Sequence, residues 1–358
     1  MSIEQGGSKV ERGLVDDGEL VRSYSEAAPL LELGKHFDGV VMTAVMMDAA
    51  SRRGPPPSMT SREDLMVEDN LARRMWERYE PVHQLVYFAP EAREAMEGLG
   101  MRGYWMGYFA LRAAPLGPAP ACVVTSCFYV FHPDRAASAL PDAWNVAGPQ
   151  QVIEARERGV DAAMRSLYGC DVVDSAELAE AADLAWEAAR AADTAGRVLG
   201  AANQALPRPA QPHVRLWQAA TTLREHRGDG HVAVLVGRGL GPVEALVLKS
   251  ATGETDAEFQ RRIRRWDIEA WQAAQAALRG RGWIDEEERL TAVGAAAHEQ
   301  MEADTDAAAA APWHALGTKA SARLAHLLEP LARRVLDSGI VPTANPVGLT
   351  DGTWRSAG

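Results

Sequence analysis

Residues 216–236, LWQAATTLREHRGDGHVAVLV, carry the densest group of titratable side chains in the chain. The first half of this stretch is apolar and predicts a helix. Gly228 and Gly230 lie among the charged residues that follow, so we expect the helix to break there. Charged groups between buried segments must be paired, bound to a ligand or used in chemistry. The stretch predicts a small-molecule or metal site at a helix end, or else a buried ion-pair network. The groups concerned are Glu225, His226, Arg227, Asp229 and His231.

The composition is that of an acidic globular protein. The chain has 358 residues and a formal net charge of -12, and an acidic chain repels a phosphate backbone unless its basic residues cluster. This argues against DNA as a partner without excluding it. The three cysteines form no CxxC pair, the N-terminus resembles no secretory signal, and no apolar run is long enough to span a membrane. We therefore expect a cytoplasmic protein without membrane contact.

Proline-rich segments suggest where the chain divides. Residues 54–58 (GPPPS) enforce an extended break, so the residues before it are expected to be a flexible appended segment or a translated leader. A second proline-rich stretch at 206–212 predicts a boundary between two helical modules. The predicted segments are 1–64 (appended), 65–205 (N-terminal helical, winged-helix-like module), 206–350 (C-terminal winged-helix module and closing helix) and 351–358 (tail).

The C-terminal module has the clearest pattern. An amphipathic helix is predicted over 266–282, followed by two short apolar segments, 283–284 and 290–291, on either side of a charged turn. A further helix is expected from 292 to 303, capped by Thr291. Helix, two-stranded wing and helix together are typical of a winged helix.

Several segments resemble known proteins. Residues 276–306, AALRGRGWIDEEERLTAVGAAAHEQMEADTD, resemble the MarR-like winged-helix proteins. Residues 66–350 resemble an actinobacterial helix-turn-helix family, through EPVHQLVYFAPE (80–91), RGYWMGYFALRAAPLG (102–117), LPDAW (140–144) and LREHRGDGH (223–231). The resemblance implies a transcription regulator.

A Trp-led helix with an Arg two turns later occurs twice, at Trp105 and Arg112 and again at Trp217 and Arg224. This is either an internal repeat or a chance similarity. With the wing pattern, it leads to the predicted fold: mostly α, with two winged-helix-like modules and short β-wings.

The charges of the C-terminal module bear on DNA binding. The turn 285–288 (DEEE) would repel a nearby phosphate. The basic run 261–265 (RRIRR) could contact phosphates, or it could form a solvated helix face paired with Asp256 and Glu258. Such a module can also be retained for packing or dimerisation, and a homodimer is one expectation.

Two sets of residues could form a site for chemistry. Glu80 and His83 have the Glu-x-x-His spacing of carboxylate–histidine metal sites. Joined to the 225–231 group, they could bind a divalent metal through His83, His226 and His231. Without metal, the same set could supply acid–base catalysis. The candidate catalytic residues are His226, Asp229, His231, Glu225, Glu80 and His83.

The second set could bind a ligand. Tyr87, Trp105 and Tyr108 could line an apolar pocket or simply pack in the core, and Arg112 and Arg224 could clamp a carboxylate or phosphate or pair with Glu80 or Glu225. No Gly-rich or Walker motif indicates a nucleotide cofactor. The leading prediction is an acid–base or metal-assisted enzyme of unknown reaction, acting on a small organic ligand at the module interface. The alternative is a ligand-responsive MarR-type DNA-binding regulator.

Overall fold

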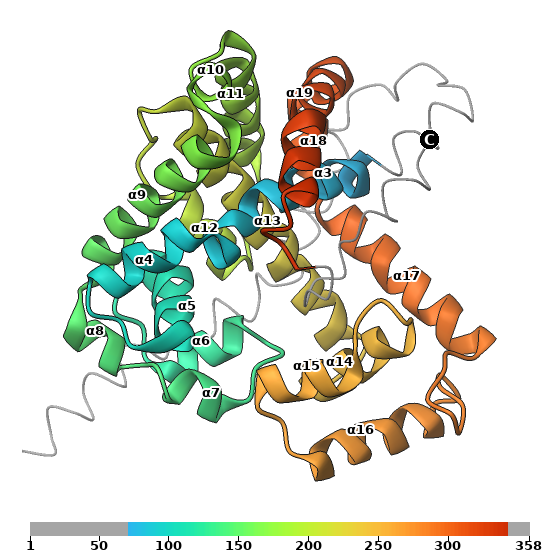
Figure 1. Ribbon diagram of the computed structural model, residues 1–358. Coiled ribbons are helices and arrows are strands. Elements are labelled where there is room, and N and C mark those ends of the chain that lie inside the picture. Colours follow the sequence, from blue (N-terminus) through green and yellow to red (C-terminus); the bar gives the residue numbers. More distant parts are fainter. Residues whose placement is uncertain (1–70, 343–358) are drawn as a thin grey trace, which may run out of the picture. The chain divides into compact units, whose positions relative to one another are not determined.

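The computed structural model describes residues 71–342, which are largely helical (Figure 1). The predicted segment 1–64 and the tail 351–358 lie outside these residues. The first part of the chain forms α3 (Leu71–Phe88), α4 (Pro90–Gly98), α5 (Gly103–Ala113), η1 (Ala114–Leu116), α6 (Ala121–Cys127), α7 (Pro133–Ala137) and α8 (Asp142–Val146). The middle forms α9 (Pro149–Tyr168), α10 (Cys170–Val173), α11 (Ala176–Ala191) and α12 (Val198–Gln204). The last part forms α13 (Pro212–Gly237), α14 (Pro242–Ala251), α15 (Ala257–Arg264), α16 (Ile268–Gly280), α17 (Ala292–Ala308), α18 (Ala311–Leu316) and α19 (Thr318–Asp337).

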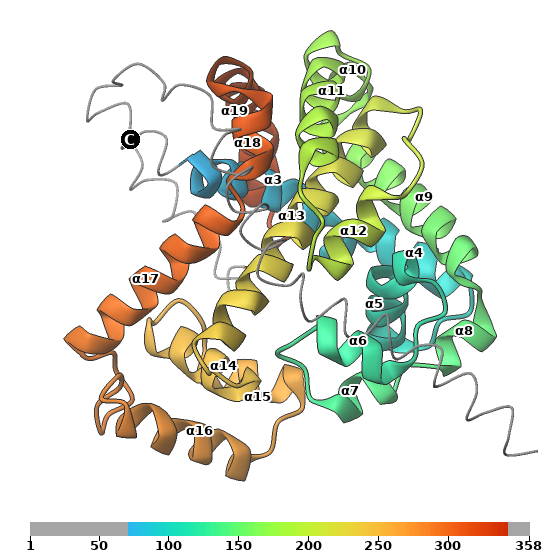
Figure 2. The same cartoon turned by 180° about the vertical axis from the view of Figure 1, so that it is seen from behind.

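The helix α13 is the central element of the larger core. Pro212 at the first position of α13 favours a helix start. Most residues of α13 as far as Arg227 are buried on every side of the helix, as expected of a core helix. It packs against α3, α9, α11, α12 and α17 (Figures 1 and 2). The larger apolar core takes residues from both sides of the predicted boundary at 205/206.

A second, smaller core joins α14, α15 and α16. Trp271, Ala274 and Leu278 repeat at helical spacing and form the buried face of α16. They pack with residues of α14 and with Leu235 at the end of α13. Asp256 caps α15 and Asp267 caps α16, and residues 265–267 make the turn between these two helices.

The predicted β-wings are wrong. Within residues 71–342 the structure has no β-strand, and the expected wing at 283–291 reduces to one antiparallel bridge between Ile284 and Leu290. The turn closes at once because the Asp285 N–H donates to the Arg289 carbonyl at 2.9 Å, and α17 then starts at Ala292. No chain is left to extend the ladder. The fold is therefore helical in both predicted modules, without winged-helix wings.

The predicted break in the central helix is also wrong, because α13 continues through Gly228 and Gly230. Gly230 lies where the side chain of Arg197 comes close to α13. A Cβ atom there would lie 2.3 Å from Nη1 of Arg197, which crosses the helix at this point. Burial of the helix outweighs the cost of about 1 kcal/mol for each helical glycine.

The residue pattern also predicts helices over roughly 149–168, 175–201 and 318–337. The first and the third are confirmed as α9 and α19, whereas the second is divided into α11 and α12. No single helix in the described part of the chain is long and apolar enough to cross a membrane, although α13 and α14, bent by 102°, would pass that test as a pair.

Candidate functional site

The residues predicted as one site lie on different sides of α13. Successive residues of an α-helix are separated by about 100° around its axis. Glu225 therefore faces α5, His226 faces α12, and Arg227 faces α17. An unbroken helix separates the groups that a broken one could have brought together.

Glu225 is the centre of a buried ion pair. Its carboxylate accepts hydrogen bonds from Nε and Nη2 of Arg112 at 2.8 and 2.9 Å, and one from Arg224 at 3.1 Å. Burial alone would raise the pKa of Glu225, but the guanidiniums of Arg112 and Arg224 lower that pKa far below its ordinary value. The two arginines predicted to clamp a ligand therefore already bind an internal carboxylate.

Glu80 and His83 lie beside this ion pair. Glu80 is buried 3.7 Å from Arg224, and burial raises its pKa. His83 contacts Thr221 Oγ1 through Nδ1 at 3.0 Å and the Tyr87 hydroxyl through Nε2 at 3.2 Å. The Thr221 hydroxyl donates to a backbone carbonyl, so His83 Nδ1–H donates to Thr221 and Nε2 accepts from Tyr87. Both ring nitrogens are engaged, and burial followed by the Arg224 charge lowers the pKa of His83.

A small cavity lies between these groups. His83, Tyr87, Arg112, Arg156 and Glu225 are among the residues that line it. Its volume of about 10 Å³ is that of a single water site. His226, His231 and Glu80 do not line it, and as it stands it is too small for an organic substrate.

His226 and Asp229 face α12. A carboxylate oxygen of Asp229 accepts the backbone N–H of Gly200 at 2.8 Å, in the first turn of α12, which satisfies a donor that the helix leaves unpaired. Burial raises the pKa of Asp229 to about 6. Burial and then Arg197 lower the pKa of His226 to about 4. This pair therefore joins α13 to α12.

Arg227 and His231 face α17. Arg227 lies 2.6 Å from Asp306, and Arg73 of α3 also pairs with Asp306, at 3.1 Å. The His231 Nδ1 contacts Thr305 Oγ1 at 3.0 Å, and burial lowers the pKa of His231 to about 4. These contacts hold α3, α13 and α17 together.

The predicted metal set is not assembled. Among residues 71–342, no group of three His, Cys, Asp or Glu side chains is placed to hold a metal ion. His83, on α3, faces α13 itself, whereas His226 faces α12 and His231 faces α17. Catalytic roles for these residues stay predictions.

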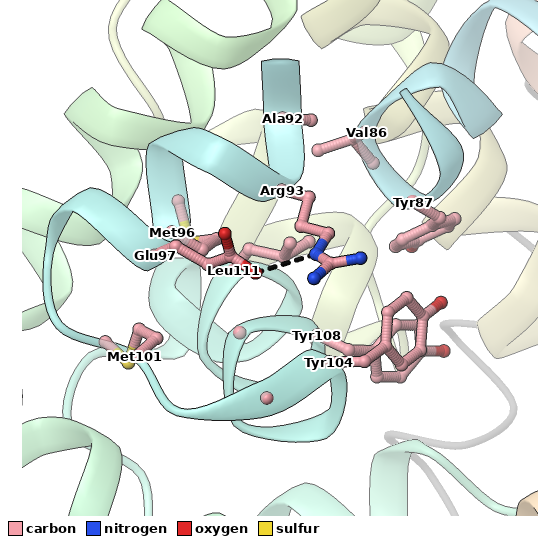
Figure 3. A pocket seen from close by; sticks show the side chains of 12 residues that line it. Val86, Tyr87, Ala92, Arg93, Met96, Glu97, Met101, Tyr104, Tyr108 and Leu111 are labelled. Carbon is pink, nitrogen blue, oxygen red and sulfur yellow. Dashed lines mark hydrogen bonds and ion pairs between the residues drawn. The ribbon is translucent and has the colours of Figure 1, made fainter. Parts of the chain in front are cut away.

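The predicted aromatic wall forms a continuous cluster. Tyr108 lies 5.2 Å from Tyr87 and 5.6 Å from Trp105, measured between ring centroids. One side of the cluster borders a cavity of about 30 Å³, lined mainly by apolar residues such as Met96 and Leu111 (Figure 3). Arg93 pairs with Glu97 at its edge.

The basic run 261–265 is divided by the geometry of α15. Arg261 pairs with Glu258 at 2.8 Å, whereas Arg262 and Arg265 are exposed and make no ion pair within the described residues. Arg264 is buried. Sequence reasoning treated the run as one surface, although the one-turn spacing of Gln260 and Arg264 places them together on the buried face.

The acidic turn is partly neutralised, since Glu287 lies 3.0 Å from Arg289 and both Glu286 and Glu288 lie 3.7 Å from Arg279.

A family model described as a helix-turn-helix family matches residues 72–342. The chain belongs to this helix-turn-helix family. No curated protein and no solved structure matches the chain. Membership in this family favours DNA as a partner, against the expectation drawn from the acidic composition, and supports neither an enzyme nor the narrower MarR-like assignment.

We predict that Glu225→Gln destabilises the protein by about 3–5 kcal/mol, because Arg112 loses its carboxylate partner and Arg224 keeps only Glu80, at 3.7 Å. The matched control is Glu180→Gln, which removes a half-exposed carboxylate paired with Arg323 and should cost much less stability, because solvent screens this ion pair. Urea unfolding of the three proteins measures both changes. Equal, small losses in the two variants would show that the buried ion pair contributes little.

We predict opposite effects of His226 and Asp229 on the pH dependence of stability. The pKa of His226 is about 4, below the ordinary 6.5, so the unfolded chain binds the extra proton and the His226 contribution is lost as pH falls from about 6.5 toward 4. Between pH 7.5 and 5, His226→Gln should therefore lose about 1–2 kcal/mol less stability than the wild type.

The pKa of Asp229 is raised, so its protonation favours the folded state as pH falls, and Asp229→Asn should lose more stability than the wild type over the same range. Identical pH slopes in the wild type and in both variants would contradict this assignment.

Proposed function

We propose that this protein binds double-stranded DNA through α15 and α16 and acts as a transcription regulator. The observation that carries the proposal is the pair of exposed arginines, Arg262 and Arg265, at the turn between these helices in a chain of a helix-turn-helix family. Guanidiniums without carboxylate partners remain free to bind phosphates, which position a protein on DNA. Family membership alone would not name the residues that make the contact.

The outer face of α16 supplies the base contacts in this proposal. Ile268, Gln272, Ala273 and Ala276 are exposed on this helix, whereas Trp271 and Leu278 anchor its other face in the small core. The amide of Gln272 can bind adenine through two hydrogen bonds in the major groove, and alanine methyl groups suit contact with thymine. We therefore propose a site rich in A·T pairs.

The net charge of -12 does not oppose this arrangement locally. Exposed charges separated by more than about 10 Å are largely screened at 0.1 M salt. The acidic segment 285–288 lies at the other end of α16, about 20 Å along the helix from the turn, and it pairs with Arg279 and Arg289. Arg262 and Arg265 make no ion pair within the described residues, so both can bind phosphate beside the start of α16.

We predict that Arg262→Ala and Arg265→Ala each weaken DNA binding by a similar factor for all sequences. Each change should also reduce the slope of log K against log salt by about 1, because one phosphate contact is lost. The DNA is first selected from random-sequence duplexes by the full chain, and affinity is then measured by fluorescence anisotropy at several salt concentrations. Arg323→Ala on α19 makes the same charge change away from this turn and should leave the slope unaltered. Failure to select any DNA would overturn the proposed function.

We predict that Gln272→Ala affects recognition instead of general affinity. It should cost about 1–3 kcal/mol on the selected sequence and much less on an unrelated duplex, since only base contacts depend on sequence. Anisotropy with both duplexes measures the ratio. An equal loss on both would place Gln272 outside the base-reading surface.

A further inference from the structure

Arg156 of α9 is a buried cation without a carboxylate partner. Its side chain is 2% exposed and makes no ion pair within residues 71–342. Nη1 donates to the Leu111 carbonyl and Nη2 to the side-chain oxygen of Gln218, both at 3.0 Å. These two acceptors are neutral, and the buried Nε has no hydrogen-bond partner among the described residues. Because a buried charge without a counter-ion is costly, Arg156 has capacity for an anion.

Arg156 lines the small cavity at His83. Tyr87, Arg112 and Asn203 line it as well, and its volume is about 10 Å³. The lining residues come from α3, α5, α9, α12 and α13, which pack on one another (Figure 1). A cavity of this volume admits one particle of about the size of a water molecule, and it excludes polyatomic anions such as sulfate. Tyr87 and Arg112 are only half-buried, which gives a small ion a path from solvent.

The charged residues that line the cavity leave one positive charge uncompensated. Arg112 and Glu225 form the buried ion pair, and the same carboxylate also accepts from Arg224. Arg156 is the second cation of the lining, which contains no second carboxylate. Burial lowers the pKa of Arg156 to about 10, so it stays protonated at neutral pH. His83 adds no negative charge, since burial lowers its pKa and leaves the ring neutral.

Nearby acids outside the lining do not replace the missing carboxylate. Glu157 acts on the charge of Arg156 but forms no ion pair with it, and burial raises the pKa of Glu157. Glu80 lies 3.7 Å from Arg224, and burial raises its pKa as well. The excess positive charge therefore remains at the cavity.

We propose that this cavity binds a chloride ion between Arg156 and Arg112. A halide ion accepts hydrogen bonds and donates none, and guanidinium groups donate hydrogen bonds and accept none. The Asn203 amide has a further donor, because only one of its two N–H groups is needed for its bond to the Leu199 carbonyl. A water molecule fits the same volume but does not compensate the charge. A bound ion would join α9 to α5, as Glu225 joins α5 to α13, and it does not depend on DNA binding.

The first test measures the Tm of the full chain while chloride replaces gluconate at constant ionic strength. A ligand that binds only the folded state raises the Tm, so the wild type should show a saturable rise of about 2–4 °C. Arg156→Met should abolish this rise, whatever its own Tm, and Arg156→Lys should retain part of it. The rise measures chloride binding, so a purely structural role of Arg156 would not remove it.

Arg264→Met is the matched control. Arg264 is also buried and makes no ion pair within the described residues, but it does not line the cavity. The variant should therefore keep the chloride-dependent rise of the wild type. No saturable rise in the wild type, or an equal rise in Arg156→Met, would overturn the proposal.

The second test needs no variant and so does not depend on whether Arg156→Met folds. Crystals of the full chain are grown in chloride, and diffraction is measured at a long wavelength, at which chlorine scatters anomalously. The proposal predicts an anomalous peak in the cavity between Arg156 and Arg112. Ordinary density there without an anomalous peak would assign a water molecule to the cavity and overturn the chloride site.

Discussion

The buried carboxylate of Glu225 is the constraint on which the arrangement of the helices depends. It holds Arg112 of α5 and Arg224 of α13 at once, in a region from which water is largely excluded. Two guanidiniums cannot be buried side by side without such a charge between them. Glu225 thereby fixes α5, and the aromatic residues that α5 carries, against the central helix. The aromatic cluster and the small cavity at His83 both take their position from this contact.

A short segment, residues 128–134, connects α5 to α15 and α16. Phe128 and Phe131 pack against α5, and the segment that follows them hydrogen-bonds to the end of α15 through His132 and Asp134. Trp266, in the turn before α16, donates to the Val130 carbonyl at 2.9 Å. The two helices proposed to bind DNA are therefore connected to the arginine and tyrosine cluster through one short segment.

The sequence was informative where periodicity and capping decide local structure. The pattern over 149–168 predicted α9 correctly, and Thr291 caps α17 as expected. Prediction failed where long-range packing decides. Gly228 and Gly230 predict a break when only local sequence is considered, but α13 continues through both, and at Gly230 it packs closely against the side chain of Arg197 from the start of α12. The wing failed because a single bridged pair leaves too little chain for a ladder.

The candidate site was only partly predictable for the same reason. Pairing of Arg112 and Arg224 with Glu225 was among the alternatives, yet the set of His83, His226 and His231 depended on a helix break that is absent. The burial of Arg264 was missed because its one-turn spacing from Gln260 places both on one face of α15, but the spacing does not say that this face is the buried one.

Hydrogen–deuterium exchange of the full chain, with and without the DNA selected by it, tests the central claim most directly. If α15 and α16 form the DNA-binding surface, the strongest protection on adding DNA should fall in residues 257–282, and Arg262→Ala should reduce it. Protection concentrated in α9, α11 or α19, with residues 257–282 unaffected, would contradict the account.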